Sequence, residues 1–336
     1  MTRSADVTAA SSPRTGPDSP RPASGPPAPP EPVEADGVKR PRRRREIPYA
    51  LFLVPGGLLL LAVIIVPFVM NTALSLTEWE GVGTPEFVGL DNYTELARDT
   101  EFWASFRHNI AVTLAMAVIP TCIGLVLAAG LFDYIGKRFG PRTAAFLRAC
   151  IYLPQVLPIA VAGIVWSWIL APEDGALNAL LGAVGLEALQ QDWLGDPRRA
   201  LFSVMGVMVW VQIGFPLVIF MSGLQRVDPA LYEAAEIDGA SWWRRFWHVT
   251  IPQIRPEIFV ALLWCTIASL KAFAFIYVLT KGGPGGATSV PSYYSFENFF
   301  DTTRVGYGAA VATVLALIII ALTVVFLRRQ SKGEEG

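Results

Sequence analysis

Six long apolar runs constrain this chain more than any other feature of its sequence. Each run is long enough for a helix that crosses about 30 Å of hydrocarbon, which needs about 20 residues. The runs lack the apolar and polar alternation of a membrane barrel, and a helix satisfies its own backbone groups in lipid. The sequence therefore predicts an all-α, polytopic fold with six transmembrane helices inside residues 47–330. The six runs lie at about residues 50–74, 109–132, 150–170, 201–224, 257–280 and 307–327.

Lys and Arg residues are divided unevenly between the two sides that these spans define. If the N-terminus lies in the cytoplasm, the inner flanks hold seventeen of them and the outer segments hold six. Basic residues are enriched on the cytoplasmic side of membrane proteins. The count therefore predicts a multi-pass protein of the cell membrane with both termini in the cytoplasm. The six outer residues are Arg98, Arg107, Arg198, Arg199, Lys281 and Arg304.

Residues 1–46 differ in composition from the rest of the chain. They hold ten of the 26 prolines and almost no large apolar side chains. Such a segment cannot bury enough surface to offset its ordering entropy, so it is predicted to be a disordered cytoplasmic tail. It ends in the basic cluster Lys39-Arg40-Pro41-Arg42-Arg43-Arg44-Arg45, which anionic membrane lipid attracts. Nucleic acid is not predicted as a partner, because the net charge of the whole chain is −1.

The sequence indicates no catalytic residue and no metal site. Cys122, Cys150 and Cys265 lie in or beside apolar runs without metal-ligand spacing, so we expect reduced, packed thiols. His108 and His248 are 140 positions apart and suggest no nucleophile–histidine–carboxylate site. A membrane-embedded enzyme would need clustered catalytic residues within the spans, and the apolar runs offer none.

The connection between the fourth and fifth spans, residues 225–256, has the pattern of two short helices. Asp228 is a predicted N-cap, with Pro229 at the first helical position. Gly239 stands where the end of this helix needs a residue tolerant of positive φ. The first helix should present Leu231, Ala234, Ala235 and Asp238 on one face. Ser241 can cap the second, with Trp243, Phe246, Trp247 and Thr250 on its apolar side and with Pro252 and Pro256 after it.

Periodicity alone leaves two interpretations of this connection open. It is either a docking element for a partner protein or an amphipathic hairpin on the membrane surface, where its tryptophans would suit the interface. The residues decide between them, because they resemble the EAA motif of permease subunits from binding-protein-dependent ABC importers. The matching residues are Glu233-Ala234-Ala235, Asp238-Gly239-Ala240, Phe246, Ile251-Pro252 and Pro256.

Further segments resemble the carbohydrate branch of the same family. Its EAA motif usually ends in Ile-x-Leu-Pro, and here Val249-Thr250-Ile251-Pro252 makes a mild apolar substitution. Leu279–Thr288 is similar to the Gly-Gly-Pro segment that follows span five in sugar permeases of the maltose type. The segments 87–93 and 151–154 also resemble that branch. The resemblance covers residues of about 47 to 328.

The resemblance implies the type I importer fold and the role of a non-catalytic permease subunit. Such a subunit forms half of the translocation pathway for a sugar of the maltose, trehalose or glycerol-phosphate type. Its partners are a second permease, two ATPase subunits and an extracytoplasmic solute-binding protein. The sequence contains no phosphate-binding loop, so no cofactor is expected on this chain, and ATP and Mg belong to the partner ATPase. ATPase coupling falls to Glu233, Ala234, Ala235, Asp238, Gly239, Phe246 and Pro252.

Polar and aromatic residues within the spans are the candidates for the substrate path. Lys271 is costly in a span unless it faces a cavity or a partner, although it can also snorkel to the surface. Tryptophans in spans also serve as interface anchors or packing residues. A non-sugar solute such as glycerol phosphate is an alternative substrate. A secondary carrier is disfavoured, because the span centres lack Asp and Glu. The candidates are Lys271, Gln212, Trp210, Phe275 and Tyr277.

Overall fold

The structure, a computed structural model, describes residues 50–333. The chain divides into two compact units, residues 1–54 and 55–336. The predicted disordered tail with its basic cluster lies outside the described residues. The fold below is therefore that of the second unit, together with the helix that runs into it from residue 50.

Helices make up most of the described chain. Two two-residue strands, β1 (Thr77–Glu78) and β2 (Glu86–Phe87), pair antiparallel with Thr77 opposite Phe87. Five short segments have other helical geometry: π-helical η1 (Leu61–Ile65), η2 (Gly130–Ile135), η4 (Phe246–Thr250) and η5 (Glu297–Asp301), and 3-10 helical η3 (Glu187–Leu189). The α-helices are α1 (Ala50–Leu60), α2 (Val66–Leu74), α3 (Asp91–Arg98), α4 (Thr100–Ala129), α5 (Gly136–Phe139), α6 (Pro141–Val156), α7 (Ile159–Ile169), α8 (Ala176–Ala183), α9 (Ala200–Gln212), α10 (Gly214–Leu224), α11 (Pro229–Ile237), α12 (Trp242–Arg245), α13 (Ile251–Gln253), α14 (Arg255–Leu270), α15 (Ala274–Leu279), α16 (Pro291–Phe296) and α17 (Val305–Gly333).

Four of the described helical stretches are long and apolar enough to cross a membrane, which confirms a polytopic helical protein. Two bent helix pairs raise the number to six if each pair is one span. The six-span topology thus stays a prediction. The four stretches are Phe52–Leu74, Thr100–Ile135, Ala200–Leu224 and Val305–Phe326, and the pairs are Pro141–Val156 with Ile159–Ile169, bent by 96°, and Trp242–Gln253 with Arg255–Leu270, bent by 76°.

Two predicted spans are not single helices. The run at 150–170 breaks at Leu157, whose ψ of 136° is extended, because a residue before proline is pushed out of the helical region. The run at 257–280 divides into α14 and α15, with Lys271–Phe273 between them. The second span begins earlier than predicted, at Thr100, because the Asp99 side chain caps α4 by accepting hydrogen bonds from two backbone amides.

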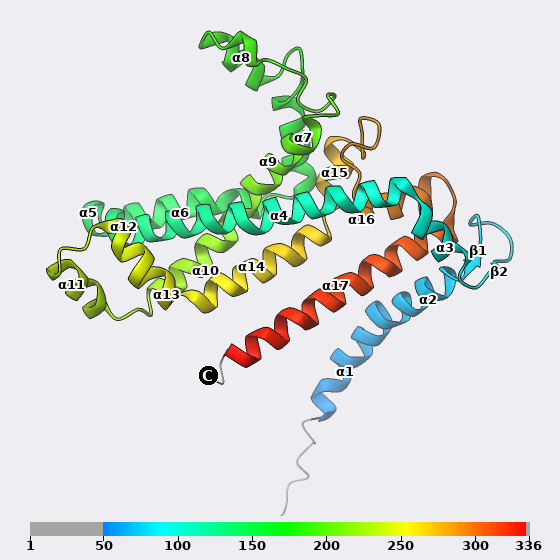
Figure 1. Ribbon diagram of the computed structural model, residues 1–336, viewed down its shortest axis with the longest axis horizontal. Helices are drawn as coiled ribbons and strands as arrows, with labels where there is room; N and C mark the ends of the chain where they lie inside the picture. The colour runs from blue at the N-terminus through cyan, green and yellow to red at the C-terminus, as the bar shows by residue number, and fades with distance from the viewer. Residues whose placement is uncertain (1–49, 334–336) are drawn as a thin grey trace, which may run out of the picture. The chain divides into compact units, whose positions relative to one another are not determined.

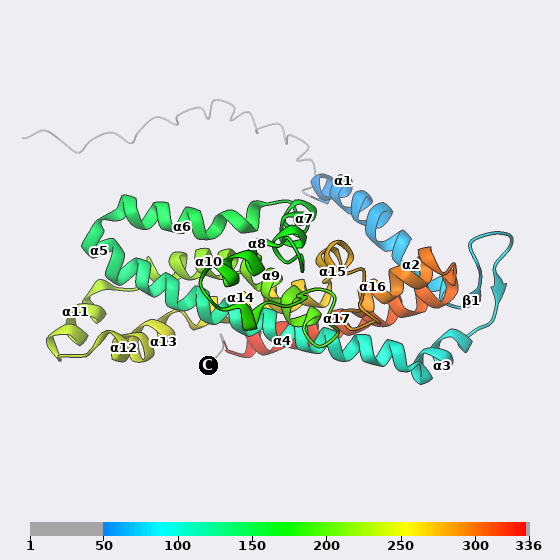
Figure 2. The same ribbon diagram turned by 90° about the horizontal axis from the view of Figure 1, so that it is seen from above.

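The long helices pack around α4. It contacts α9, α10 and α14, while α17 packs against α2 and α16, and α15 packs against α7. Figures 1 and 2 show α11, α12 and α13 together with α5 at one end of α4, and α3 and the two strands near its other end. Small residues allow close helix approach in membranes. At Gly124 of α4 an added Cβ would lie only 2.9 Å from Cβ of Pro216 on α10.

The crossing of α4 and α10 predicts a steric cost for a side chain at this glycine. We expect Gly124→Ala to lower the stability of the purified protein by about 1–3 kcal/mol, the usual cost of an overpacked core. The thermal unfolding midpoint in detergent measures the effect. Gly130→Ala is the matched control, because a Cβ at Gly130 meets no atom within 4 Å. Equal midpoints for the two variants would contradict the close crossing.

Candidate functional site

The first helix of the 225–256 connection is capped as the sequence predicts. Asp228 Oδ1 accepts a hydrogen bond of 2.9 Å from the Ala230 amide, and Pro229 opens α11. At the other end Gly239 adopts a φ of +72°, in the left-handed region. Its amide donates to the Glu236 carbonyl at 3.0 Å, and the next amide, of Ala240, donates to Ala235 at 2.9 Å. This pair of bonds is a Schellman turn, which glycine favours because it has no Cβ to strain the backbone.

The second helix differs from the prediction in two respects. It is continuous from Trp242 to Gln253 through α12, η4 and α13, and the break before α14 falls at Ile254, so Pro252 lies inside the helix. Ser241 precedes it in an extended conformation but makes no side-chain capping bond. The predicted apolar side is also partly wrong. Trp242, rather than Trp243, packs inward, with its ring 5.2 Å from that of Phe246.

The two helices present an exposed surface with large apolar side chains. Ile237 is 86% exposed, and Trp243 and Trp247 are 57% and 60% exposed. Among the predicted coupling residues, Ala235 is half-buried, Phe246 is buried, and Glu233, Ala234, Asp238, Gly239 and Pro252 are exposed. Several exposed apolar side chains on neighbouring short helices are typical of a protein interaction site. We call this patch, Leu231, Ala234, Ile237, Trp243 and Trp247, the docking face.

The opposite side of the helix pair is anchored in the bundle. Phe246 is only 4% exposed and belongs to a buried cluster with Leu131 of η2 and with Leu217, Phe220 and Leu224 of α10. A second link joins the two helices to each other, because the Tyr232 hydroxyl lies 3.1 Å from Thr250 Oγ1 in a buried contact. The docking face is thus backed by side chains that are packed against the long helices.

Arg245 adds an electrostatic link that the sequence did not reveal. Its Nη2 lies 3.1 Å from Asp133 Oδ2, at the end of the second span, and its Nη1 lies 3.3 Å from Glu236 Oε2 on α11. Arg245 and Asp133 are only 14% and 11% exposed, whereas Glu236 is 65% exposed. Coulomb attraction is stronger away from water, so the pair with Asp133 is the more important one. An acid at the end of an apolar run was the only sequence signal for this contact.

Of the five residues predicted for the substrate path, Phe275 and Trp210 share one core cluster, whereas Lys271 and Tyr277 are exposed. Lys271 is exposed at the C-terminal end of α14, and Tyr277 is 39% exposed with its ring 5.4 Å from that of Phe273. Phe275 is buried in the core instead. Trp210 is half-buried and meets Trp166 edge to face at a ring distance of 5.4 Å. Lys271 lies in the break between α14 and α15 and not within a continuous helix. At this break the Ser292 hydroxyl donates a hydrogen bond to the Ala272 carbonyl.

Gln212 belongs to a buried polar region between α4, α9 and α14. Its Nε2 lies 3.5 Å from Cys265 Sγ. Ser269 follows Cys265 by four residues on α14, and its Oγ lies 3.1 Å from Thr113 Oγ1. The Thr113 hydroxyl in turn donates to Asn109 Oδ1 at 3.4 Å. The Asn109 amide nitrogen is buried and has no hydrogen-bond partner within the described chain. Polar groups within spans are costly, so this region is a better candidate for the substrate path than Lys271 or Phe275.

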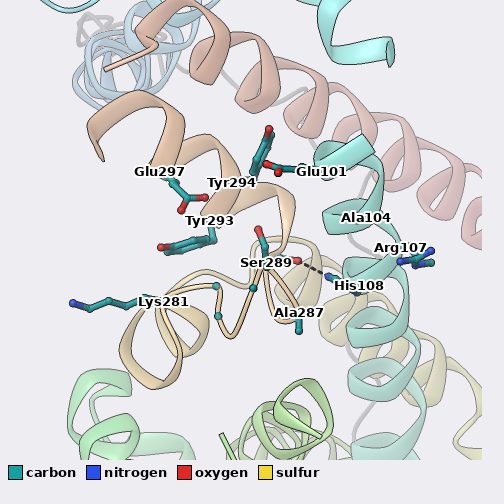
Figure 3. A pocket seen from close by; sticks show the side chains of 14 residues that line it. Glu101, Ala104, Arg107, His108, Lys281, Ala287, Ser289, Tyr293, Tyr294 and Glu297 are labelled. Atoms are coloured by element: carbon teal, nitrogen blue, oxygen red, sulfur yellow. Dashed lines mark hydrogen bonds between the residues drawn. The ribbon is translucent and has the colours of Figure 1, made fainter. Parts of the chain in front are cut away.

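The Gly-Gly-Pro segment borders a cavity of about 590 Å³. The cavity lies between the first turns of α4, the loop at 281–289 and α16 (Figure 3). His108 points toward the loop, with Nδ1 3.0 Å from the Ser289 carbonyl. Burial raises the pKa of Glu297 at its edge, and the negative charges of Asp301 and Glu101 raise it further. The cavity is lined by two acidic side chains, Glu101 and Glu297, and by two basic side chains, Arg107 and Lys281.

Asp99 fixes the beginning of α4 beside this cavity. Its Oδ2 accepts a hydrogen bond of 2.6 Å from the Tyr294 hydroxyl and another from Tyr307, while Oδ1 caps α4. Burial opposes ionisation, but these hydrogen bonds together outweigh it and hold the pKa of the carboxyl below its usual value of 3.8. The carboxylate therefore stays charged and joins α4, α16 and α17.

The cysteines and histidines form no recognisable reaction centre in the described chain. Cys265 is buried, but Cys122 and Cys150 are exposed, so the expectation that all three thiols are packed is wrong for those two. Their helices turn these positions away from the bundle core. Among residues 50–333, no group of three or more His, Cys, Asp or Glu side chains could hold a metal ion.

Comparison with known proteins gives consistent matches over most of the chain. Residues 121–332 match the family model described as binding-protein-dependent transport system inner membrane component. A probable ABC transporter permease protein, YurN, from Bacillus subtilis is 37% identical over 86% of this chain and 97% of its own length. The trehalose/maltose transport system permease protein MalF from Thermococcus litoralis is 33% identical, covering 83% and 92%. The diacetylchitobiose uptake system permease protein NgcF from Streptomyces coelicolor is also 33% identical, over 91% and 90%.

A solved structure has the same fold. The crystal structure of a bacterial ABC transporter involved in the import of the acidic polysaccharide alginate aligns with a TM-score of 0.72. The alignment covers 84% of this chain and 94% of that chain at 20% identity. The predicted importer permease fold is thereby confirmed.

The contact between Arg245 and Asp133 predicts a strong coupling in a double-mutant cycle. We expect Arg245→Leu and Asp133→Leu each to lower the free energy of unfolding by roughly 3 kcal/mol, because each takes the oppositely charged neighbour at 3.1 Å away from a largely buried charge. The double variant should lose much less than the sum, since it leaves neither charge behind. Thermal unfolding in detergent compares the four proteins. Arg244→Leu is the control, because Arg244 is exposed, and additive losses would contradict the pairing.

Proposed function

The chain belongs to the family of binding-protein-dependent transport system inner membrane components, and we propose that it is the permease subunit of an ATP-driven sugar importer. Relatives at 33% identity are named for trehalose or maltose and for diacetylchitobiose, which are saccharides. In this role the chain forms half of a translocation pathway. It carries out no chemistry of its own, and ATP and Mg are bound by a partner ATPase.

The docking face is the observation that carries the coupling role. Large apolar side chains are exposed on α11 and on the helix of Trp242–Gln253, while Phe246 anchors the same helices in the bundle. An ATPase subunit that accepts this face in a cleft would shield the apolar surface from water. When ATP closes the two ATPase subunits, the helix pair moves as one body, and Phe246 and Arg245 transmit the motion to α10 and to the end of the second span. Coupling in this scheme involves Glu233, Ala234, Ala235, Asp238, Gly239, Phe246 and Pro252.

The proposed topology has six spans and both termini in the cytoplasm. The uneven distribution of Lys and Arg supports this orientation. It is also supported by the separation of α11–α13 and α5 from the strands and α3, which gather toward opposite ends of α4 (Figure 1). The docking face then lies on the cytoplasmic side, where an ATPase is found.

The complete importer would contain a second permease, two ATPase subunits and an extracytoplasmic solute-binding protein. A solved alginate transporter with the same fold was crystallised in complex with its pentasaccharide-bound periplasmic protein. By analogy, the loop at 281–289 and its charged cavity are the surface we assign to a binding protein. Sugar would then pass the polar region around Gln212, Thr113 and Ser269 on its way through the bundle.

The experiment that tests this function is reconstitution of the whole complex in lipid vesicles. ATPase activity is measured with the binding protein and a panel of maltose, trehalose, diacetylchitobiose, glycerol phosphate and amino acids. We expect one or more of the saccharides to stimulate hydrolysis and to accumulate in the vesicles. Stimulation by amino acids or metal ions and by none of the sugars would overturn the substrate class.

Gly239→Asp should uncouple ATP hydrolysis from transport. The side chain would strain a backbone at φ +72° and add a charge beside the docking face. A Cβ at this position meets no atom within 4 Å, so insertion and folding should persist. We expect normal membrane levels and at least a tenfold loss of uptake, measured with labelled sugar. Normal uptake by a correctly inserted variant would remove the coupling role of Gly239.

Lys271→Met tests the remaining charged candidate for the substrate path. Lys271 is exposed at a helix break and does not line the charged cavity beside the loop at 281–289. We therefore expect Lys271→Met to change the KM for uptake less than threefold. Gln212→Leu is the contrasting variant, and it should raise KM about tenfold by removing a buried hydrogen-bonding group. Uptake kinetics of both inserted variants distinguish the two positions. A large KM effect at Lys271 alone would reverse this assignment.

A further inference from the structure

A second cavity, of about 540 Å³, lies between α7, α9 and the segment that connects them. Its apolar wall includes the aromatic side chains of Trp166, Trp193 and Phe202. Three hydrogen-bonding side chains, Gln191, Arg199 and Ser203, line the same space. Gly206 of α9 also lines this space and is exposed, and an added Cβ there would meet no atom within 4 Å. This combination of aromatic faces and a few polar groups is the usual lining of a small-molecule site.

The wall of this cavity is held in place by one buried side chain. Asn178 is 4% exposed, and its Nδ2 donates to the carbonyls of Pro172 and Gln191, each at 2.9 Å. Its Oδ1 accepts a 2.8 Å hydrogen bond from the Trp193 indole. Trp193 also packs against the core cluster together with Trp166. The two tryptophan faces are therefore positioned before any ligand binds, which reduces the entropic cost of binding, whereas Phe202 is 69% exposed.

The charge and polarity of the lining side chains distinguish a neutral sugar from a charged ligand or a lipid tail as the occupant of the cavity. Arg199 brings a positive charge, but Asp196 lies 3.5 Å from its Nε and compensates it. A site without net charge favours a neutral ligand. The connecting segment at 171–199 is rich in polar and charged residues, including Glu173, Asp174 and Asp192, which places it outside the hydrocarbon in the proposed topology. Trp166, Phe202 and Ser203 lie at the outer ends of the third and fourth predicted spans, so the cavity lies where these spans meet the outer segment. A sugar ring uses both kinds of lining there, because it has an apolar face for the tryptophans and hydroxyls for the polar side chains, whereas a lipid tail would leave the polar side chains without partners.

We propose that this aromatic cavity, lined by Trp166, Trp193, Phe202, Gln191, Arg199 and Ser203, is an outer subsite for a neutral saccharide. The inference rests on the proposed function and deepens it, because it places a binding step on the outer side of the permease, before the polar region around Gln212. A sugar released from the binding protein stacks on the tryptophans and exchanges its hydrogen bonds with water for bonds to Gln191 and Ser203.

The test fills the cavity without disturbing its wall. Gly206→Leu adds a large side chain to the cavity lining, and Gly56→Leu is the matched control, because a Cβ at Gly56 also meets no atom within 4 Å. The whole complex is studied in lipid nanodiscs and vesicles with maltose, trehalose and diacetylchitobiose as probes. We expect Gly206→Leu to raise the KM for uptake about five- to tenfold, with kcat nearly unchanged, and Ser203→Ala to act in the same direction with a smaller effect. Saturation-transfer NMR without the binding protein should show sugar binding to the wild type and to Gly56→Leu and a much weaker signal for Gly206→Leu.

The outcomes separate the inference from the function on which it rests. If the wild-type complex transports none of the saccharides, the proposed function fails. If it transports a sugar and Gly206→Leu has the same KM and the same NMR signal, the outer subsite alone is refuted. If Gly206→Leu impairs transport while the sugar signal is unchanged, the cavity seats lipid or the second permease, and the saccharide assignment is overturned.

Discussion

The anchoring of the helix pair formed by α11 and Trp242–Gln253 is the interaction on which the rest of this structure depends. Phe246 is buried among the apolar side chains of α10 and η2, and Arg245 pairs with Asp133 at 3.1 Å. A buried aromatic ring resists displacement because its removal leaves a cavity, and a largely buried ion pair resists separation because each charge alone is costly. The docking face can therefore be exposed without being loose. A force applied to it reaches the long helices directly.

The breaks in the long helices are the second feature with functional weight. Backbone groups freed by a break in a membrane helix need other partners. At the end of α14 the Ser292 hydroxyl bonds to the Ala272 carbonyl, and at Leu157 the following proline requires an extended backbone. The break at Leu157 is exposed, whereas the break after α14 includes the buried Ala272.

The sequence predicted features that depend on neighbouring residues better than contacts between residues that are far apart in the chain. The N-cap at Asp228 and the glycine turn at Gly239 were predictable, because each depends on residues within one or two turns. The partners of Arg245 and Gln212 were not, since Asp133 and Cys265 are more than fifty positions away in the sequence. The arrangement of the substrate-path candidates could not be predicted for a related reason. Polar and aromatic types identify candidates, but helix rotation decides which of them are buried together.

The sequence by itself determined that this chain is a helical membrane protein with a helix pair at 225–256 whose first helix is capped by Asp228, because apolar run length and this cap are local properties of the chain. The residue pattern of that pair and of the Gly-Gly-Pro segment was sufficient to indicate the family. Only the tertiary structure decided which face of the pair is exposed, since the inward position of Trp242 and Phe246 depends on the surfaces of α10 and η2. It alone decided the aromatic cavity as well, because Trp166, Trp193 and Phe202 come from three segments that only packing brings together.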